Sequence, residues 1–171
     1  MHMTTAIFPG SFDPPTYGHM NIIERASRLF DKVDVVVAVN TAKKYFFEAE
    51  ERLLMLKALT EPYQNVSVHL WNRLIVEYAK ENHANVLLRG IRNMSDFSYE
   101  FDLSLMNHSL SPQIETLFMP TEPRFFTIKS SAIKEIAAFG GDISSMVPPV
   151  VAAAMKEKAS QASSVRNSER S

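Results

Sequence analysis

A histidine that follows a glycine and a serine near the start of the chain is the first candidate for chemistry. In the segment AIFPGSFDPPTYGH, Gly10 and Ser11 come directly after a short apolar run, and His19 closes the segment. Glycine has no Cβ, so Gly10 lets a ligand approach the backbone closely, and Ser11 adds a hydroxyl and an N–H group there. An imidazole beside them can donate a hydrogen bond to a phosphate oxygen. The segment therefore indicates a phosphate site.

The same segment predicts the start of a helix, and His19 falls in its first turn. Thr16 can cap that helix, whose first N–H groups carry partial positive charge and favour an anion. His19 lies three and four residues before Ile22 and Ile23, which belong to the predicted sheet-facing stripe. We therefore expect His19 at the mouth of a sheet. The alternative is a hydrogen-bonded core histidine at a helix start.

Two arginines follow a later apolar run. Arg89 ends the segment NVLLR, and Arg92 comes three residues later. A guanidinium at the end of a central strand is costly unless it is paired or binds an anion. Arginine makes forked contacts to phosphate oxygens, so the pair suits a polyphosphate. The alternative is that the two arginines pair with Asp96 or Glu100.

A lysine and two serines complete the set of phosphate candidates. Lys43 follows the second apolar run in a predicted loop, where its flexible charge can reach a phosphate. Ser130 and Ser131 precede a helical pattern, so their hydroxyls and the first helical N–H groups would form a phosphate cradle. The alternatives are a solvent-exposed lysine and serines that only cap the helix.

The composition of the chain argues against several classes of function. The net charge of −1 does not favour wholesale binding to nucleic acid or to an acidic membrane. The chain has no cysteine, which removes disulfides, thiolate zinc sites and cysteine nucleophiles together. We propose no metal site built by the protein, because His2, His69, His83 and His108 show no ligand spacing. No apolar run is long enough to span a membrane and no signal segment opens the chain, so we expect a soluble, cytoplasmic protein.

Apolar runs that alternate with amphipathic segments must position these residues. The five predicted strands are TAIFP, VDVVVAVN, VSVHL, NVLLR and ETLFM. The predicted helical stripes are Ile22, Ile23, Ala26, Leu29 and Phe30; Leu74, Ile75, Tyr78 and Ala79; and Phe97, Phe101 and Leu105. Helical segments also follow the second and fifth strands, as EAEERLLMLKAL and SSAIKEIAAFGG.

This alternation predicts an α/β fold, a single doubly wound, Rossmann-like domain with a five-stranded parallel sheet and helices on both faces. Ligands in such sheets bind beyond the carboxyl ends of the strands. We expect the domain to span residues 4–158 and to end in a short helix from Pro149 to about Lys158. The polar residues 159–171 predict a disordered tail.

The motif of threonine, any residue, glycine and histidine at this place resembles the signature of the nucleotidyltransferase superfamily. The longer string FPGSFDPPTYGH, the segment RGIR and the serine pair together resemble the bacterial phosphopantetheine adenylyltransferases. The resemblance extends from about Thr5 to Lys158.

This resemblance implies transfer of AMP from ATP, with Mg²⁺, to 4′-phosphopantetheine. It implies a homohexamer, coenzyme A as a feedback ligand, and His19 as the catalytic residue. The acceptor would contact Ser11, Lys43, Leu74, Ile75, Arg89, Asn107 and Glu135. ATP would contact Ser11, Phe12, His19, Gly90, Ile91, Arg92, Glu100, Phe125, Phe126, Thr127, Ile128, Lys129, Ser130 and Ser131.

One position departs from the family pattern. Lys129 stands before the serine pair, where the family usually has serine. Two alternatives stay open from the sequence. One is a related nucleotidyltransferase with another acceptor or base, such as a cytidylyltransferase for a phosphorylated alcohol. The other, which Lys129 favours, is a module that binds ATP or coenzyme A without catalysis.

Overall fold

A five-stranded parallel sheet forms the centre of the protein. The structure is a computed structural model that describes the backbone of residues 4–168 and the side chains of residues 4–161. The strands lie in the order β3-β2-β1-β4-β5, which confirms the predicted α/β fold. Their bounds are Thr5–Gly10 for β1, Lys32–Ala38 for β2, Val66–Trp71 for β3, Val86–Ile91 for β4 and Glu115–Pro120 for β5.

The strand order reverses at β1, and this reversal creates the place for a ligand. The chain moves outward from β1 to β2 and β3, then returns to the other side of β1 for β4 and β5. Strand β1 pairs with β2 up to Gly10, opposite Val37, and with β4 at Ile7, opposite Leu87. The connections leave β1 and β4 in opposite directions, so a crevice opens beyond their carboxyl ends.

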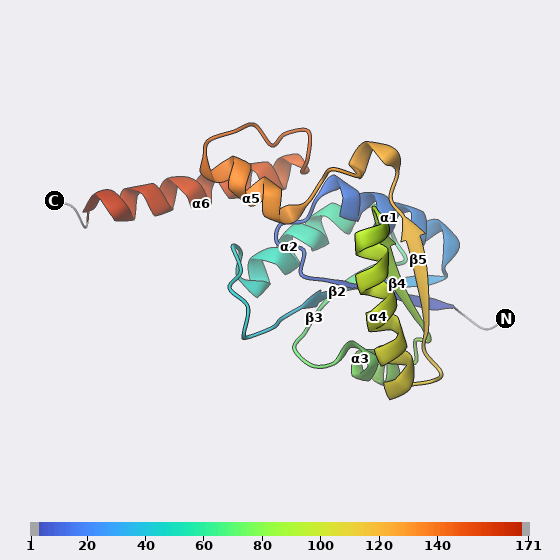
Figure 1. Ribbon diagram of the computed structural model, residues 1–171. Helices are drawn as coiled ribbons and strands as arrows, with labels where there is room; N and C mark the ends of the chain where they lie inside the picture. Colours follow the sequence, from blue (N-terminus) through green and yellow to red (C-terminus); the bar gives the residue numbers. More distant parts are fainter. Residues whose placement is uncertain (1–3, 169–171) are drawn as a thin grey trace.

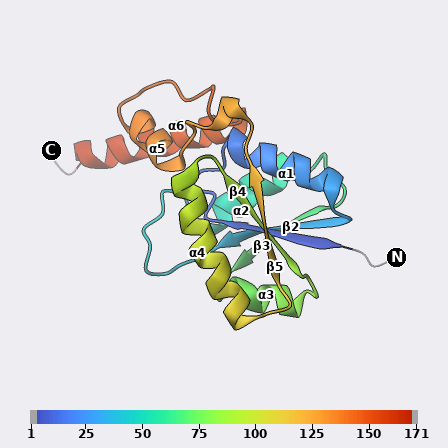
Figure 2. The same ribbon diagram turned by 45° about the vertical axis from the view of Figure 1, so that its right-hand side comes forward.

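Helices cover both faces of the sheet (Figures 1 and 2). Their bounds are Tyr17–Leu29 for α1, Ala49–Thr60 for α2, Ile75–Glu81 for α3, Met94–Leu110 for α4, Ser130–Ala138 for α5 and Pro149–Ser168 for α6, with a 3₁₀ turn, η1, at Pro123–Phe125. Helices α1 and α2 share one hydrophobic cluster with the sheet, while α3 packs in a second cluster on Ile7, Val36 and Leu87. Successive residues of a strand face opposite sides, which separates Ile7 from its neighbour Phe8.

A third apolar cluster lies outside the sheet and joins α2, α5 and α6. Phe47 and Met55 pack there with Ile133 of α5 and with Val151 and Met155 of α6. This cluster fixes the start of α5 relative to the sheet. The helix that begins with the serine pair is therefore held over the carboxyl edge by buried side chains.

Only some residues of the predicted helical stripes are buried in the structure. Ile22, Ile23 and Ala26 are buried as expected, but Leu29 is 68% exposed. Helix α4 contacts β4 and β5, yet none of its described residues is buried, and Leu105 is 56% exposed. Helix α4 covers the outer part of the sheet, so one of its sides meets β4 and β5 while several of its large apolar side chains stay exposed among the described residues.

The last helix is longer than the sequence predicts. Helix α6 continues to Ser168 instead of ending near Lys158, and in Figure 1 its red end extends away from the sheet. The predicted disordered tail is thus helical over residues 159–168, while residues 169–171 lie outside the described part. No glycine or proline interrupts residues 159–168, so nothing in the local sequence stops the helix. In the part of the chain that the structure describes, no helix has both the length and the apolar character that a membrane crossing requires.

Candidate active site

A cleft of about 370 Å³ opens at the carboxyl ends of β1 and β4, where the strand order reverses. Three segments bring polar groups to it: the loop from β1 to α1, the turn after β4, and the start of α5. The lining residues are Phe8, Pro9, Gly10, Ser11, Phe12, Thr16, Gly18, His19, Ile22, Arg89, Gly90, Arg92, Glu100, Thr121, Ile128, Lys129, Ser130 and Ser131.

Two glycines allow the walls of the cleft to approach closely. A Cβ on Gly10 would lie 3.0 Å from the ring of Phe12, and a Cβ on Gly90 would lie 3.1 Å from Cγ1 of Ile22. Both separations are shorter than carbon atoms normally accept. Glycine at these positions therefore lets the Phe12 ring fold over β1 and lets α1 pack directly on β4.

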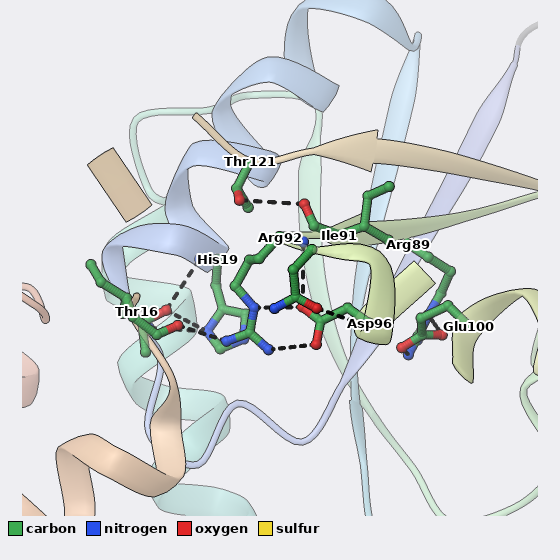
Figure 3. Close-up of polar contacts among 10 residues, drawn as sticks. Thr16, His19, Arg89, Ile91, Arg92, Asp96, Glu100 and Thr121 are labelled. Carbon is green, nitrogen blue, oxygen red and sulfur yellow. Dashed lines mark hydrogen bonds and ion pairs between the residues drawn. The ribbon is translucent and has the colours of Figure 1, made fainter. Parts of the chain in front are cut away.

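Thr16 and His19 form a reciprocal cap at the start of α1 (Figure 3). The hydroxyl of Thr16 accepts from the backbone N–H of His19 at 3.3 Å, and the backbone N–H of Thr16 donates to Nδ1 of His19 at 3.0 Å. Because Nδ1 accepts a hydrogen bond from an N–H group, the proton of the neutral imidazole resides on Nε2. His19 is therefore a hydrogen-bond donor through Nε2.

The surroundings of His19 keep its imidazole neutral. Burial of the ring, and then the charge of Arg92, lower the pKa of His19 from 6.5 to about 4. The Phe12 ring packs edge-on against the imidazole with centroids 5.0 Å apart. A neutral donor on the cleft wall suits an oxygen that gains negative charge during a reaction.

Arg89 is held at the end of β4 by a carboxylate and a carbonyl. Its Nε and Nη2 donate to the two carboxylate oxygens of Glu100 at 2.6 and 2.5 Å, and its Nη1 donates to the carbonyl of Pro9 at 2.9 Å. Both side chains of the ion pair are largely buried. The pairing with Glu100, which the sequence left as an alternative, is present. The guanidinium has more N–H groups than these bonds use, so it can also bind an anion in the cleft.

Arg92 links the turn after β4 to the segment that leads into α5. Its Nε donates to Asp96 at 2.7 Å, and its Nη1 donates to the carbonyl of Ile128 at 2.7 Å. In the same region, the hydroxyl of Ser130 donates to the carbonyl of Pro14 at 3.0 Å. Arg92 and the start of α5 are therefore placed on the same side of the cleft, as a phosphate chain would need.

The structure brings most of the nucleotide residues together but leaves others outside the cleft. Of the predicted set, Ser11, Phe12, His19, Arg89, Gly90, Arg92, Glu100, Ile128, Lys129, Ser130 and Ser131 line it. The predicted residues that do not line it are Lys43, Leu74, Ile75, Ile91, Asn107, Phe125, Phe126, Thr127 and Glu135. Lys43 and Glu135 are exposed, and Leu74 is 55% exposed. Their roles stay predictions.

Sequence reasoning missed one residue that lines the cleft and two buried charged residues at the loop after β1. Thr121 lines it and is buried, with its backbone N–H donating to the carbonyl of Ile91 at 2.9 Å. Arg52 is buried under the loop after β1 and donates to the carbonyl of Ser11 at 2.7 Å. Asp13 is 3% exposed. For Asp13, the signal in the sequence is a charged residue directly before Pro14 and Pro15.

Comparisons with known proteins show which family this chain resembles. Residues 7–136 match a family model described as cytidylyltransferase-like. A phosphopantetheine adenylyltransferase of Caldanaerobacter subterraneus subsp. tengcongensis is 47% identical over 91% of this chain and 98% of the relative. One of Clostridium botulinum is 46% identical over 91% of this chain and 95% of the relative.

The chain belongs to the phosphopantetheine adenylyltransferase family. This membership does not favour the alternatives of a different acceptor or base. A crystal structure described as "a Putative Nicotinate-nucleotide Adenylyltransferase from Vibrio parahaemolyticus" covers 92% of this chain and 94% of its own, with a TM-score of 0.68 and 19% identity. That likeness supports the fold alone. Within the phosphopantetheine adenylyltransferase family, the cleft at the strand reversal is the candidate active site.

Proposed function

We propose that this protein transfers AMP from ATP to 4′-phosphopantetheine and releases dephospho-coenzyme A and pyrophosphate. The observation that supports the proposal most strongly is a neutral histidine donor facing two fixed arginines in one cleft. The proposal includes a cytoplasmic location, because the reaction needs a supply of ATP. It places the step late in coenzyme A biosynthesis.

The chemistry is an in-line displacement at phosphorus. An oxygen of the 4′-phosphate attacks the α-phosphorus of ATP, the new P–O bond forms, and the bond from the α-phosphorus to the bridging oxygen breaks. Pyrophosphate carries that oxygen and the electron pair away. The attacking phosphate is already an anion, so no general base and no covalent enzyme intermediate are needed. Catalysis then consists of positioning and charge stabilisation.

Each polar group has a place in this mechanism. The Nε2–H of His19 donates to an oxygen of the α-phosphate as charge builds up there. Arg89 and Lys43 hold the acceptor phosphate. Arg92 and the N–H groups at the start of α5, with Ser130, hold the β- and γ-phosphates and then pyrophosphate. Lys43 lies outside the cleft on an exposed loop, so its long side chain would have to reach inward.

Mg²⁺ would be bound mainly by ATP. Among the described residues, no group of three or more His, Cys, Asp or Glu side chains could hold a metal ion. The carboxylates beside the cleft, Glu100 and Asp96, are already paired with arginines. The described residues therefore fit a Mg²⁺ ion that would be bound mainly by the phosphate oxygens of ATP and would neutralise their charge. They do not form a separate set of metal ligands.

Two further parts of the proposal concern assembly and feedback. An apolar surface on α4, the α4 surface, comprises Met94, Tyr99, Phe101, Leu105, Met106 and Leu110, all at least 44% exposed. We propose that copies of this chain bury it in a homohexamer, as the family resemblance implies. Coenzyme A contains the adenylate and pantetheine parts of the product, so it would compete for the same cleft as a feedback ligand.

The experiment that tests the function is pyrophosphate release by the purified protein with Mg²⁺, ATP and 4′-phosphopantetheine. CTP in place of ATP, and pantetheine without its phosphate, are the controls. We expect turnover only with the ATP and phosphopantetheine pair. Turnover with CTP would indicate a different nucleotidyltransferase. ATP binding without turnover would indicate a binding module, and Lys129→Ser would then be the first variant to test.

A further inference from the structure

Asp13 is a buried carboxylate that the proposed mechanism does not use. It lies in the loop between β1 and α1 and is 3% exposed. Its Oδ1 accepts from the backbone N–H of Phe47 at 2.9 Å, and its Oδ2 accepts from the backbone N–H of Phe46 at 2.9 Å and from Nζ of Lys134 at 2.9 Å. A buried charge is costly unless it is paired and hydrogen-bonded. Lys134 supplies the opposite charge, and all three donors supply hydrogen bonds.

The donors come from two segments that carry proposed phosphate contacts. The two backbone N–H groups lie at the end of residues 39–48, the Lys43 loop, which connects β2 to α2. Lys134 lies one turn beyond Ser130 in α5. Asp13 itself belongs to the loop that begins with Ser11. One carboxylate therefore joins the three segments that would hold the acceptor phosphate, the triphosphate and the α-phosphate.

Neighbouring contacts reinforce the same junction. The hydroxyl of Ser130 donates to the carbonyl of Pro14 at 3.0 Å, which ties α5 to the Asp13 loop a second time. Arg52 donates to the carbonyl of Ser11 at 2.7 Å, and its guanidinium lies 4.0 Å from the centroid of the Tyr45 ring. Tyr45 belongs to the Lys43 loop, so that loop is also tied to the first loop twice.

We propose that Asp13 and Lys134 form a positioning pair for the transfer reaction, an inference that rests on the proposed function. The pair fixes the Lys43 loop and the start of α5 relative to the loop that leads to His19. Neither side chain touches the reacting atoms. In-line transfer requires the attacking oxygen, phosphorus and leaving oxygen to be aligned, and a displacement of about 1 Å can cost up to about 100-fold in rate.

The variant Lys134→Met tests the pair while leaving the two backbone contacts of Asp13 in place. We expect kcat to fall by about 10- to 100-fold. We also expect the KM for ATP to rise more than the KM for phosphopantetheine, because α5 holds the triphosphate and is the segment released. Lys134→Arg keeps the positive charge, so it should restore kcat and the KM for ATP toward wild-type values.

Lys32→Met is the matched control. Lys32 is 37% exposed and lies 3.0 Å from a carboxylate oxygen of Asp34, which is fully buried; the side chain of Lys134 is 32% exposed. Lys32 begins β2, at the opposite end of the sheet from the cleft. Lys32→Met should lower the melting temperature about as much as Lys134→Met does and leave kcat and both KM values unchanged.

A purely structural pair would give a different pattern. If Lys134→Met lowers the melting temperature as Lys32→Met does but retains wild-type kcat and KM values, the proposal is wrong. Asp13→Asn should be more severe, and if it does not fold, the two Lys134 variants decide. If the wild type itself does not turn over, the proposed function fails. The positioning pair is then tested by calorimetry, which measures the Kd for ATP. An equal Kd for ATP in wild type and Lys134→Met would then overturn it.

Discussion

At the scale of single residues, the cap at the start of α1 determines how His19 can act. The Thr16 backbone N–H occupies Nδ1, so only Nε2 can donate into the cleft. We expect His19→Ala to lower kcat by about 100- to 1,000-fold, the cost of losing one donor to a developing negative charge. The free energy of unfolding should fall by only about 1–2 kcal/mol, because one cap contact and the edge-on contact with the Phe12 ring are lost. Steady-state kinetics and thermal melts check both, and near-normal turnover would remove His19 from catalysis.

The lowered pKa of His19 predicts a specific pH dependence. The folded-state pKa is about 4 and the reference value is 6.5, so the unfolded chain binds a proton in this window before the folded protein does. The contribution of His19 to stability is therefore complete above pH 6.5 and is lost as the pH falls toward 4. At pH 5.5, NMR should show a neutral imidazole that carries its single proton on Nε2. Thermal melts of His19→Gln should show a shallower loss of stability between pH 6.5 and 4 than wild type.

At the scale of elements, a buried carboxylate in β2 ties the sheet to α3. Asp34 is fully buried, and the hydroxyl of Tyr78 donates to its Oδ2 at 3.2 Å. Burial alone would raise the pKa of Asp34, but contacts from His69 and Lys32 outweigh it and hold the pKa below its usual value. The charged carboxylate therefore needs its donors.

Removing one of these donors should weaken the packing of α3 on the sheet. We expect Tyr78→Phe to lower the free energy of unfolding by about 1–3 kcal/mol, because a buried acceptor loses a partner. The control is Tyr63→Phe. Among the described residues, the Tyr63 hydroxyl makes no hydrogen bond. Urea denaturation of both variants measures the difference. Equal stability of the two would show that the Tyr78 contact contributes nothing, and kcat should stay unchanged in either.

At the scale of the whole molecule, the α4 surface predicts association. Large apolar side chains that are exposed together on one helix are typical of an interface. We expect Leu105→Glu to dissociate the proposed homohexamer into smaller species, because a charge cannot be buried there without a partner. Analytical ultracentrifugation measures the mass in solution. Leu29→Glu, at a similarly exposed leucine at the end of α1, should leave the assembly intact; a monomeric wild type would contradict the proposal.

The sequence determined the architecture because its signals are local. The β-branched run in β2 and the alternation of strands with helical stripes fix a parallel α/β sheet. The placement of His19 also follows locally, since Thr16 lies three residues away and caps the same helix. The sequence prediction ended α6 too early because the polar composition of residues 159–168 resembles a tail, although no glycine or proline there stops the helix.

Only the tertiary structure decided which distant groups meet. Asp13 accepts from a lysine 121 residues away, and Arg89 reaches the carbonyl of Pro9, 80 residues away. The Val-rich pattern around Asp34 hid a charge whose partners come from another strand and a helix. The exposure of α4 was equally hidden, because periodicity identifies an apolar face and does not say whether this chain or another copy covers it. Which distant residues pair depends on how the whole fold packs, and a short stretch of sequence carries no information about that packing.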